Sequence, residues 1–144
     1  MTDRATRDEM FKAALAAREN AHAPYSGFKV GACLLSDDGR LFAACNVENM
    51  AYSQSQCAEA SAVGVMIAAG AKGIRAALVV GDDESLCTPC GGCRQRLSEF
   101  AAPGFVMHVA GLEGVRASFT MEQLLPHAFE FHLKARGAAA ADDG

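Results

Sequence analysis

The sequence predicts an α/β fold, a three-layer α-β-α sandwich around a mixed sheet of about five strands. Segments with the apolar spacing of helices and of strands follow one another in the order helix, hairpin, then alternating helices and strands. The chain has 144 residues, the usual size of one domain, and contains no internal repeat or linker. We therefore expect one domain over residues 1–136 and a disordered Ala/Asp tail over residues 137–144.

The first predicted elements are a helix and a β-hairpin. Apolar residues fall at helical spacing from about Asp8 to Asn20, and Pro24 prevents the helix from continuing. Alternate positions of Phe28–Leu35 are apolar, which is typical of a strand with one buried face. The pair Asp38-Gly39 is a hairpin turn signal and leads into a second strand, Leu41–Val47.

The rest of the chain predicts alternating helices and strands. Helical spacing indicates helices over Cys57–Ala69 and over about Gly91–Phe100. The apolar run Ile74–Val80 indicates a strand buried on both faces. The remaining expected elements are strands over Phe105–Ala110 and Val115–Phe119 and a last helix opened by a capping box at Thr120–Gln123.

Composition excludes several classes of protein. Hydrophobic residues make up 51% of the chain and charged residues 21%, which excludes wholesale disorder. The formal net charge of −4 argues against a nucleic-acid partner. No apolar run approaches the roughly 20 residues that span a bilayer, so no membrane partner is expected. The charged N-terminal segment lacks the apolar core of a secretory signal, so we expect a cytoplasmic protein whose six cysteines serve metal binding or catalysis.

Three cysteines and one carboxylate form the sharpest pattern in the chain. Cys90 and Cys93 have the two-residue spacer that lets two thiolates reach one ion, and Cys57 lies at another predicted helix start. Three thiolates on Zn²⁺ leave one tetrahedral position open, as in catalytic zinc sites. Glu59 stands close enough to shuttle protons there, provided that Cys57 lies at the helix cap rather than inside the helix.

Two other interpretations of the cysteines are open. Cys90 and Cys93 could form a redox pair, or Cys87 could close a structural site as a fourth ligand. A structural site leaves Glu59 without a role. If the site is catalytic, Cys33, Cys45 and Cys87 are expected to be small buried apolar residues.

A His or Cys, a spacer and Glu, followed by Pro-Cys-x-x-Cys, is the signature of zinc deaminases. From about Pro24 to Phe129 the chain resembles the cytidine deaminase family, in its small class with three cysteine ligands. Four blocks in the family's order and spacing carry the resemblance. They are Pro24–Ala32 (PYSGFKVGA), Asn46–Asn49 (NVEN), Cys57–Glu59 (CAE) and Pro89–Gln95 (PCGGCRQ).

The resemblance implies a role for each matching residue. Cys57, Cys90 and Cys93 match the ligands of one zinc ion per chain, and Glu59 matches the proton shuttle. The residues matched to substrate are Asn46 and Glu48 at the ribose hydroxyls, Phe28 near the base, Tyr52 and Ala58 lining the site, and Phe129 stacked on the pyrimidine of a neighbouring subunit. The family's small members are homotetramers with shared active sites, so a homotetramer is expected here.

The implied activity is zinc-dependent hydrolytic deamination of cytidine and 2′-deoxycytidine to the uridine nucleosides, within pyrimidine salvage. Three alternatives remain at this stage: a deaminase of another small amidine such as blasticidin S, a polynucleotide editor, and a non-catalytic zinc-structured module. Asn46 and Glu48 favour a ribonucleoside, and the net charge of −4 disfavours a polynucleotide.

One position departs from the family. Many members carry an Arg after the catalytic Glu that offsets the charge of the thiolates, whereas this chain has Ala60. We expect Arg94, or the two helix ends, to supply that compensation. The sequence Cys-Ala-Glu-Ala also occurs in the blasticidin S deaminase branch.

Overall fold

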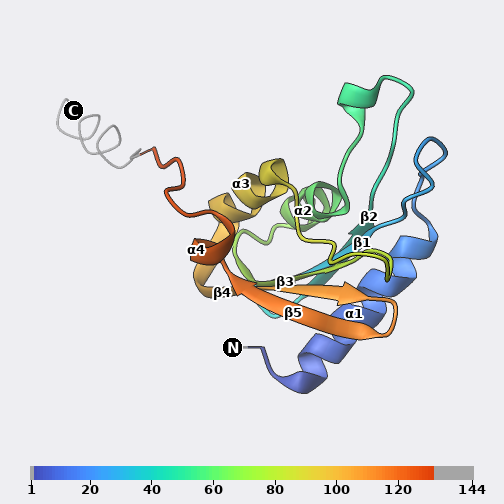
Figure 1. The fold of residues 1–144 in the computed structure, drawn as a ribbon. Helices are drawn as coiled ribbons and strands as arrows, with labels where there is room; N and C mark the ends of the chain where they lie inside the picture. The colour runs from blue at the N-terminus through green and yellow to red at the C-terminus, as the bar shows by residue number, and fades with distance from the viewer. Residues whose placement is uncertain (1, 132–144) are drawn as a thin grey trace.

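The computed structural model describes residues 2–131, which form a five-stranded sheet with helices on both faces (Figure 1). The strands lie in the order β2-β1-β3-β4-β5; only β3 and β4 are parallel, so the sheet is mixed as expected. None of the described helices is long and apolar enough to cross a membrane. The elements are α1 (Arg4–Glu19), β1 (Gly31–Ser36), β2 (Leu41–Cys45), the 3-10 helix η1 (Tyr52–Gln54), α2 (Ala58–Ala68), β3 (Ile74–Val80), α3 (Gly91–Phe100), β4 (Ala101–Gly111), β5 (Gly114–Thr120) and α4 (Met121–Leu124).

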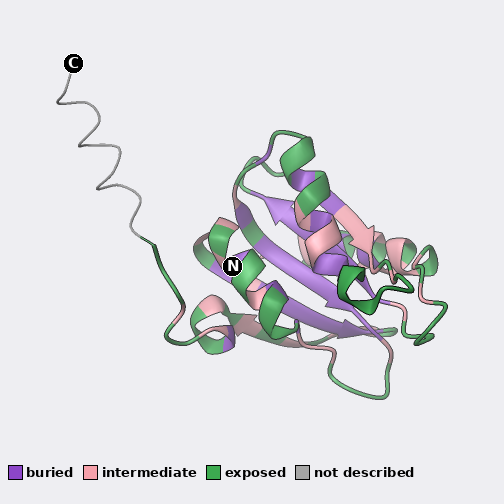
Figure 2. Ribbon diagram, turned by 90° about the horizontal axis from the view of Figure 1, so that it is seen from above, coloured by how far each residue is buried: buried purple, intermediate pink, exposed green. Residues whose placement is uncertain are grey.

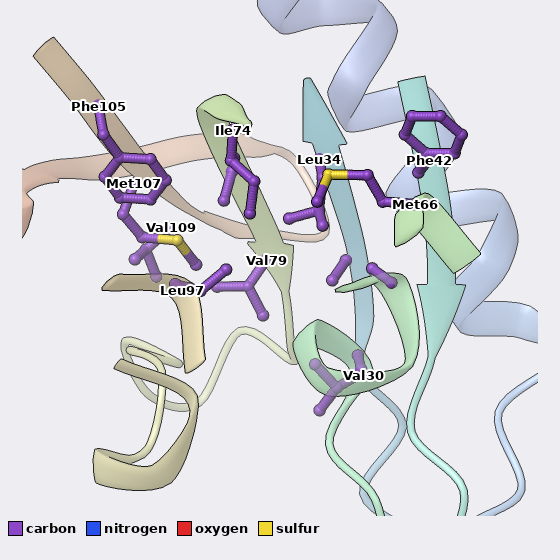
Figure 3. Close-up of a cluster of buried hydrophobic side chains, with 14 of the residues drawn as sticks. Val30, Leu34, Phe42, Met66, Ile74, Val79, Leu97, Phe105, Met107 and Val109 are labelled. Carbon is purple, nitrogen blue, oxygen red and sulfur yellow. The ribbon is translucent and has the colours of Figure 1, made fainter. Parts of the chain in front are cut away.

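Two apolar clusters hold the three layers together. On one face of the sheet, α1 buries Met10 and Ala14 against alternate strand residues such as Leu78. On the other face, α2 and α3 pack against the remaining alternate residues (Figure 3). The side chains of that second cluster include Met66, Leu97, Leu34, Val79 and Met107. Alternate residues of β3 point to opposite faces and belong to the two different clusters, so this strand is buried on both sides. Figure 2 shows the buried residues gathered along the strands of the sheet.

Several boundaries differ from the sequence prediction. Helix α1 begins at Arg4 rather than Asp8, because the carboxylate of Asp3 accepts the N–H of Thr6 at 2.8 Å and caps the helix. Strand β1 begins at Gly31 and β2 ends at Cys45, three and two residues inside the predicted bounds. Strand β4 begins at Ala101, directly after α3. The capping box at Thr120 is confirmed, whereas the predicted tail lies outside the described residues.

At Gly31 the backbone of β1 lies close against α1. A Cβ at Gly31 would overlap the carbonyl oxygen of Ala14 and stand 2.9 Å from the Cβ of Arg18. We expect Gly31→Ala to lower the free energy of unfolding by about 3 kcal/mol, because the overlap involves backbone.

Gly64 provides the matched control for this substitution. It lies inside α2 with nothing within 4 Å of the Cβ position, so Gly64→Ala should raise the free energy of unfolding by about 0.5–1 kcal/mol. Urea denaturation measures both values. Equal midpoints for the two variants would contradict the close packing of α1 on β1.

Candidate active site

Three thiols meet where the N-termini of α2 and α3 converge. Cys57 is the N-cap of α2, Cys90 is the N-cap of α3, and Cys93 lies in the first turn of α3. Their Sγ atoms all lie within 4.8 Å of one another, and those of Cys57 and Cys90 are 3.7 Å apart. Two thiolates on a tetrahedral zinc ion, each at about 2.3 Å from the metal, stand about 3.8 Å apart. The donor set and its spacing therefore fit Zn²⁺.

The three cysteine side chains differ in their exposure to solvent. Cys57 and Cys90 are exposed, whereas Cys93 is buried. Among residues 2–131, the cluster contains these three cysteines and excludes Cys87. A closed site with four cysteine ligands is therefore not formed, and a fourth ligand can come from solvent or substrate.

The other cysteines are thiols outside the cluster. Cys33 is buried, and burial raises its pKa to about 12, as expected for a small apolar core residue. Cys45 and Cys87 were also expected to be buried, but they are only partly buried. All six cysteines are free, and Cys90 and Cys93 do not form a disulfide.

The other two thiols stabilise the thiolate form of Cys57. Hydrogen bonds from the thiols of Cys93 and Cys90 lower the pKa of Cys57 to about 6, against the effect of burial, and the positive charge of Arg96 acts in the same direction. The pKa of Cys93 is raised by its hydrogen bond to Cys57 and by burial. A second and a third thiolate therefore need a counter-cation, which a divalent metal supplies.

Glu59 lies buried beside the cluster in the first turn of α2, with 5% of its surface exposed. Burial raises the pKa of its carboxyl, and the negative charge of Cys57 adds to the shift, while the thiol of Cys93 opposes it. Cys57 is the helix cap, as the joint approach of Cys57 and Glu59 to one site requires. A carboxyl whose pKa is raised toward neutrality is suited to exchanging protons.

Asn46 and Glu48 hold the segment that precedes β1. The Asn46 side chain accepts the N–H of Val30 and donates to the carbonyl of Phe28, both at 2.8 Å. The Glu48 carboxylate accepts the backbone N–H groups of Tyr25 and Ser26 and the Ser26 hydroxyl. These bonds, led by the one from the Ser26 hydroxyl, lower the pKa of Glu48. Both side chains thus position the segment that carries Phe28.

Phe28 borders the same region as the cluster. A Cβ at Gly81 would stand 3.4 Å from Cζ of Phe28 and 2.9 Å from Sγ of Cys87. Cys87 in turn lies near Glu59 and Cys57, whose negative charges contribute, after burial, to its raised pKa. Glycine at position 81 therefore leaves room for the ring and the thiol at one edge of the site.

The other predicted substrate residues differ in their placement. Ala58 is buried at the start of α2. Tyr52 is 75% exposed on η1 and packs edge-on against Tyr25, with ring centroids 5.8 Å apart. Phe129 is also 75% exposed and lines a groove beside α3 and β4, whose lining contains no other predicted site residue. The groove that Phe129 lines therefore includes none of the three cysteines.

Arg94, which the sequence analysis expected to offset the charge of the thiolates, makes its hydrogen bonds to backbone carbonyls. Its guanidinium donates to the carbonyls of Pro89 at 2.8 Å and Leu124 at 2.9 Å, so it ties the start of α3 to α4. The positive charge of Arg96, which the sequence analysis missed, contributes to the low pKa of Cys57. Its position four residues after Gly92 was the available signal, because helix side chains lean back toward the N-terminus.

Comparisons with known proteins agree with this geometry. The family described as "Cytidine and deoxycytidylate deaminase zinc-binding region" matches residues 4–109. The chain is 42% identical over 113 residues to a cytidine deaminase of Sporosarcina psychrophila, covering 78% of this chain and 83% of that protein. It is 37% identical to one of Halalkalibacterium halodurans, covering 85% of this chain and 93% of that protein.

Solved structures show the same fold. The crystal structure of cytidine deaminase from Burkholderia pseudomallei matches with a TM-score of 0.78 and 42% identity, over 90% of this chain and all of that chain (100%). That from Mycobacterium tuberculosis matches with a TM-score of 0.73 and 35% identity, over 86% of this chain and 97% of that chain. Sequence, fold and the three-thiol site agree, and the chain belongs to the cytidine deaminase family of zinc enzymes.

Proposed function

We propose that this protein deaminates cytidine and 2′-deoxycytidine hydrolytically, releasing ammonia and the uridine nucleosides. The observation that carries the proposal is the buried carboxyl of Glu59 beside three thiols at the N-termini of two helices. The relatives named cytidine deaminase support the choice of substrate.

In the proposed mechanism, Cys57, Cys90 and Cys93 hold one zinc ion. When bound, Zn²⁺ would act as a Lewis acid and lower the pKa of the attacking water. Glu59 takes one proton from the attacking water and delivers it to N3 of the cytosine ring. It then takes the second proton from the hydroxyl now on C4 and passes it to the departing amino group. The water oxygen bonds to C4 as the C4–N bond breaks, so water and cytidine become uridine and ammonia. The raised pKa of Glu59 supports this double role, because burial favours the protonated carboxyl that donates to the substrate.

We also propose that Phe28 packs against the base while Asn46 and Glu48 bind the ribose hydroxyls, with Ala58 and Tyr52 completing the wall. The Asn46 amide and the Glu48 carboxylate are fixed by bonds to the 25–30 segment, so they lose little side-chain freedom when substrate binds.

The function is tested by following the ultraviolet absorbance of cytidine with purified, zinc-loaded protein. Loss of the cytidine band is the expected result, and a panel of other small amidines runs beside it. No loss with cytidine but turnover of another amidine would replace the substrate. No turnover at all, with one zinc per chain, would favour a zinc-structured module instead.

We further propose a homotetramer in which Phe129 completes a neighbour's site. Its ring is 75% exposed and lines a groove that includes none of the three cysteines, and exposed aromatic side chains are typical of contact surfaces. A cytoplasmic role in pyrimidine salvage and a single domain over residues 1–136 belong to the same proposal. Six free cysteines are consistent with a reducing compartment.

Shared sites predict complementation between two impaired variants. Phe129→Ala alone should lower kcat/KM by about 10- to 100-fold, because one base–aromatic stack is lost. Chains carrying Phe129→Ala, co-expressed with chains carrying Glu59→Gln, should regain about one quarter of wild-type turnover, because random assembly gives that share of intact sites. Turnover per chain is measured after co-purification. Activity equal to the mean of the two pure variants would contradict a shared site.

A further inference from the structure

The cysteine cluster carries more negative charge than a zinc ion neutralises. Three thiolates within 4.8 Å of one another leave a net charge of about −1 after Zn²⁺ binds. Glu59, buried beside them, adds a further acidic group. Excess negative charge in a half-buried site opposes the deprotonation that metal binding requires. A fixed positive charge near the thiolates would therefore raise the affinity for zinc.

We propose that Arg96 is a positioning residue of the metal site, whose guanidinium offsets the charge of the thiolates and sets the affinity for zinc. The proposal rests on the zinc site of the proposed function and goes beyond it, because the residue is outside the family motif quoted above.

The geometry of α3 carries the proposal. Arg96 lies one turn after Gly92, and helix side chains lean toward the N-terminus, where Cys90 caps the helix. Nη1 of Arg96 stands 3.6 Å from the point where a Cβ of Gly92 would be, and Sγ of Cys90 stands 4.0 Å from the same point. Both groups therefore flank position 92, where glycine places no side chain.

The remaining contacts leave Arg96 available for this role. No ion pair within residues 2–131 involves Arg96. Arg94, by contrast, donates two hydrogen bonds to backbone carbonyls. The positive charge of Arg96 also contributes to the low pKa of Cys57. Since Arg96 is exposed, its effect should be partly screened by salt, and that dependence separates a charge effect from a packing effect.

The test is the zinc dissociation constant, measured by competition with a chromogenic chelator at low and at high salt. Arg96→Ala should bind zinc about 10-fold more weakly than wild type at low salt. The ratio of the two zinc dissociation constants should become smaller at high salt. Arg96→Lys should remain close to wild type, because a point charge suffices. Arg75→Ala is the matched control, since Arg75 is exposed at the far end of β3 and its loss changes the net charge equally.

Two results would overturn the proposal while leaving the proposed function intact. One is equal zinc affinity of Arg96→Ala and wild type at low salt. The other is a deficit that Arg96→Lys does not restore and that salt does not narrow, which would indicate a packing role. Failure of the wild-type protein itself to bind zinc would overturn the proposed function and this inference together.

Discussion

Replacing Glu59 by glutamine is expected to lower kcat by about 10²- to 10⁴-fold while the fold and the zinc content stay unchanged. Glutamine keeps the shape of the side chain, so the packing at the start of α2 is preserved. It can neither accept the proton of the attacking water nor deliver one to N3. The loss should therefore fall on kcat rather than on KM.

Zinc content provides the sharper half of this test. Glu59 and Cys57 are close enough for the negative charge of Cys57 to raise the pKa of the carboxyl. Removing the carboxylate therefore removes a repulsion and should leave zinc binding equal to wild type or tighter. Turnover is followed by cytidine absorbance and zinc by elemental analysis. Glu9→Gln, on the exposed side of α1, is the control that should stay fully active. An active Glu59→Gln enzyme would remove Glu59 from the mechanism.

Replacing Cys90 by serine is expected to weaken zinc binding by at least about 100-fold and to abolish turnover. A serine hydroxyl is a poor ligand because it remains protonated near neutral pH, so two thiolates would hold the metal alone. The exposed position of Cys90 at the cap of α3 means that the fold should survive the change.

Cys87→Ala is the matched control for Cys90→Ser. Cys87 is a nearby thiol outside the cluster, so its loss should leave zinc affinity unchanged. Wild-type protein stripped with a chelator should regain activity when zinc is added, whereas stripped Cys90→Ser should not. Equal loss of zinc in both variants would indicate a four-cysteine structural site instead.

Elements whose cause is local were predictable from the sequence. The apolar run of β3 and the helical spacing of α3 predicted both elements with the bounds observed, Ile74–Val80 and Gly91–Phe100. The capping box at Thr120 depends on residues three apart and was predictable for the same reason. Boundaries held by distant residues were not. In the segment before β1, backbone N–H groups donate to the side chains of Asn46 and Glu48, which lie far along the chain.

The zinc donor set is the part of the site that the sequence alone determined. Cys90 and Cys93 are joined by short spacing, and Cys57 and Glu59 flank one helix start, so residue types and local geometry were enough to predict them. Which arginine offsets the charge of the thiolates depends on the tertiary structure. Arg94 and Arg96 differ little as residues of one helix. The guanidinium of Arg94 donates to the carbonyls of Pro89 and Leu124, whereas Nη1 of Arg96 and Sγ of Cys90 both lie within 4.0 Å of the Cβ position of Gly92. Charge compensation acts through space, and the distances that govern it arise only when separate elements pack together.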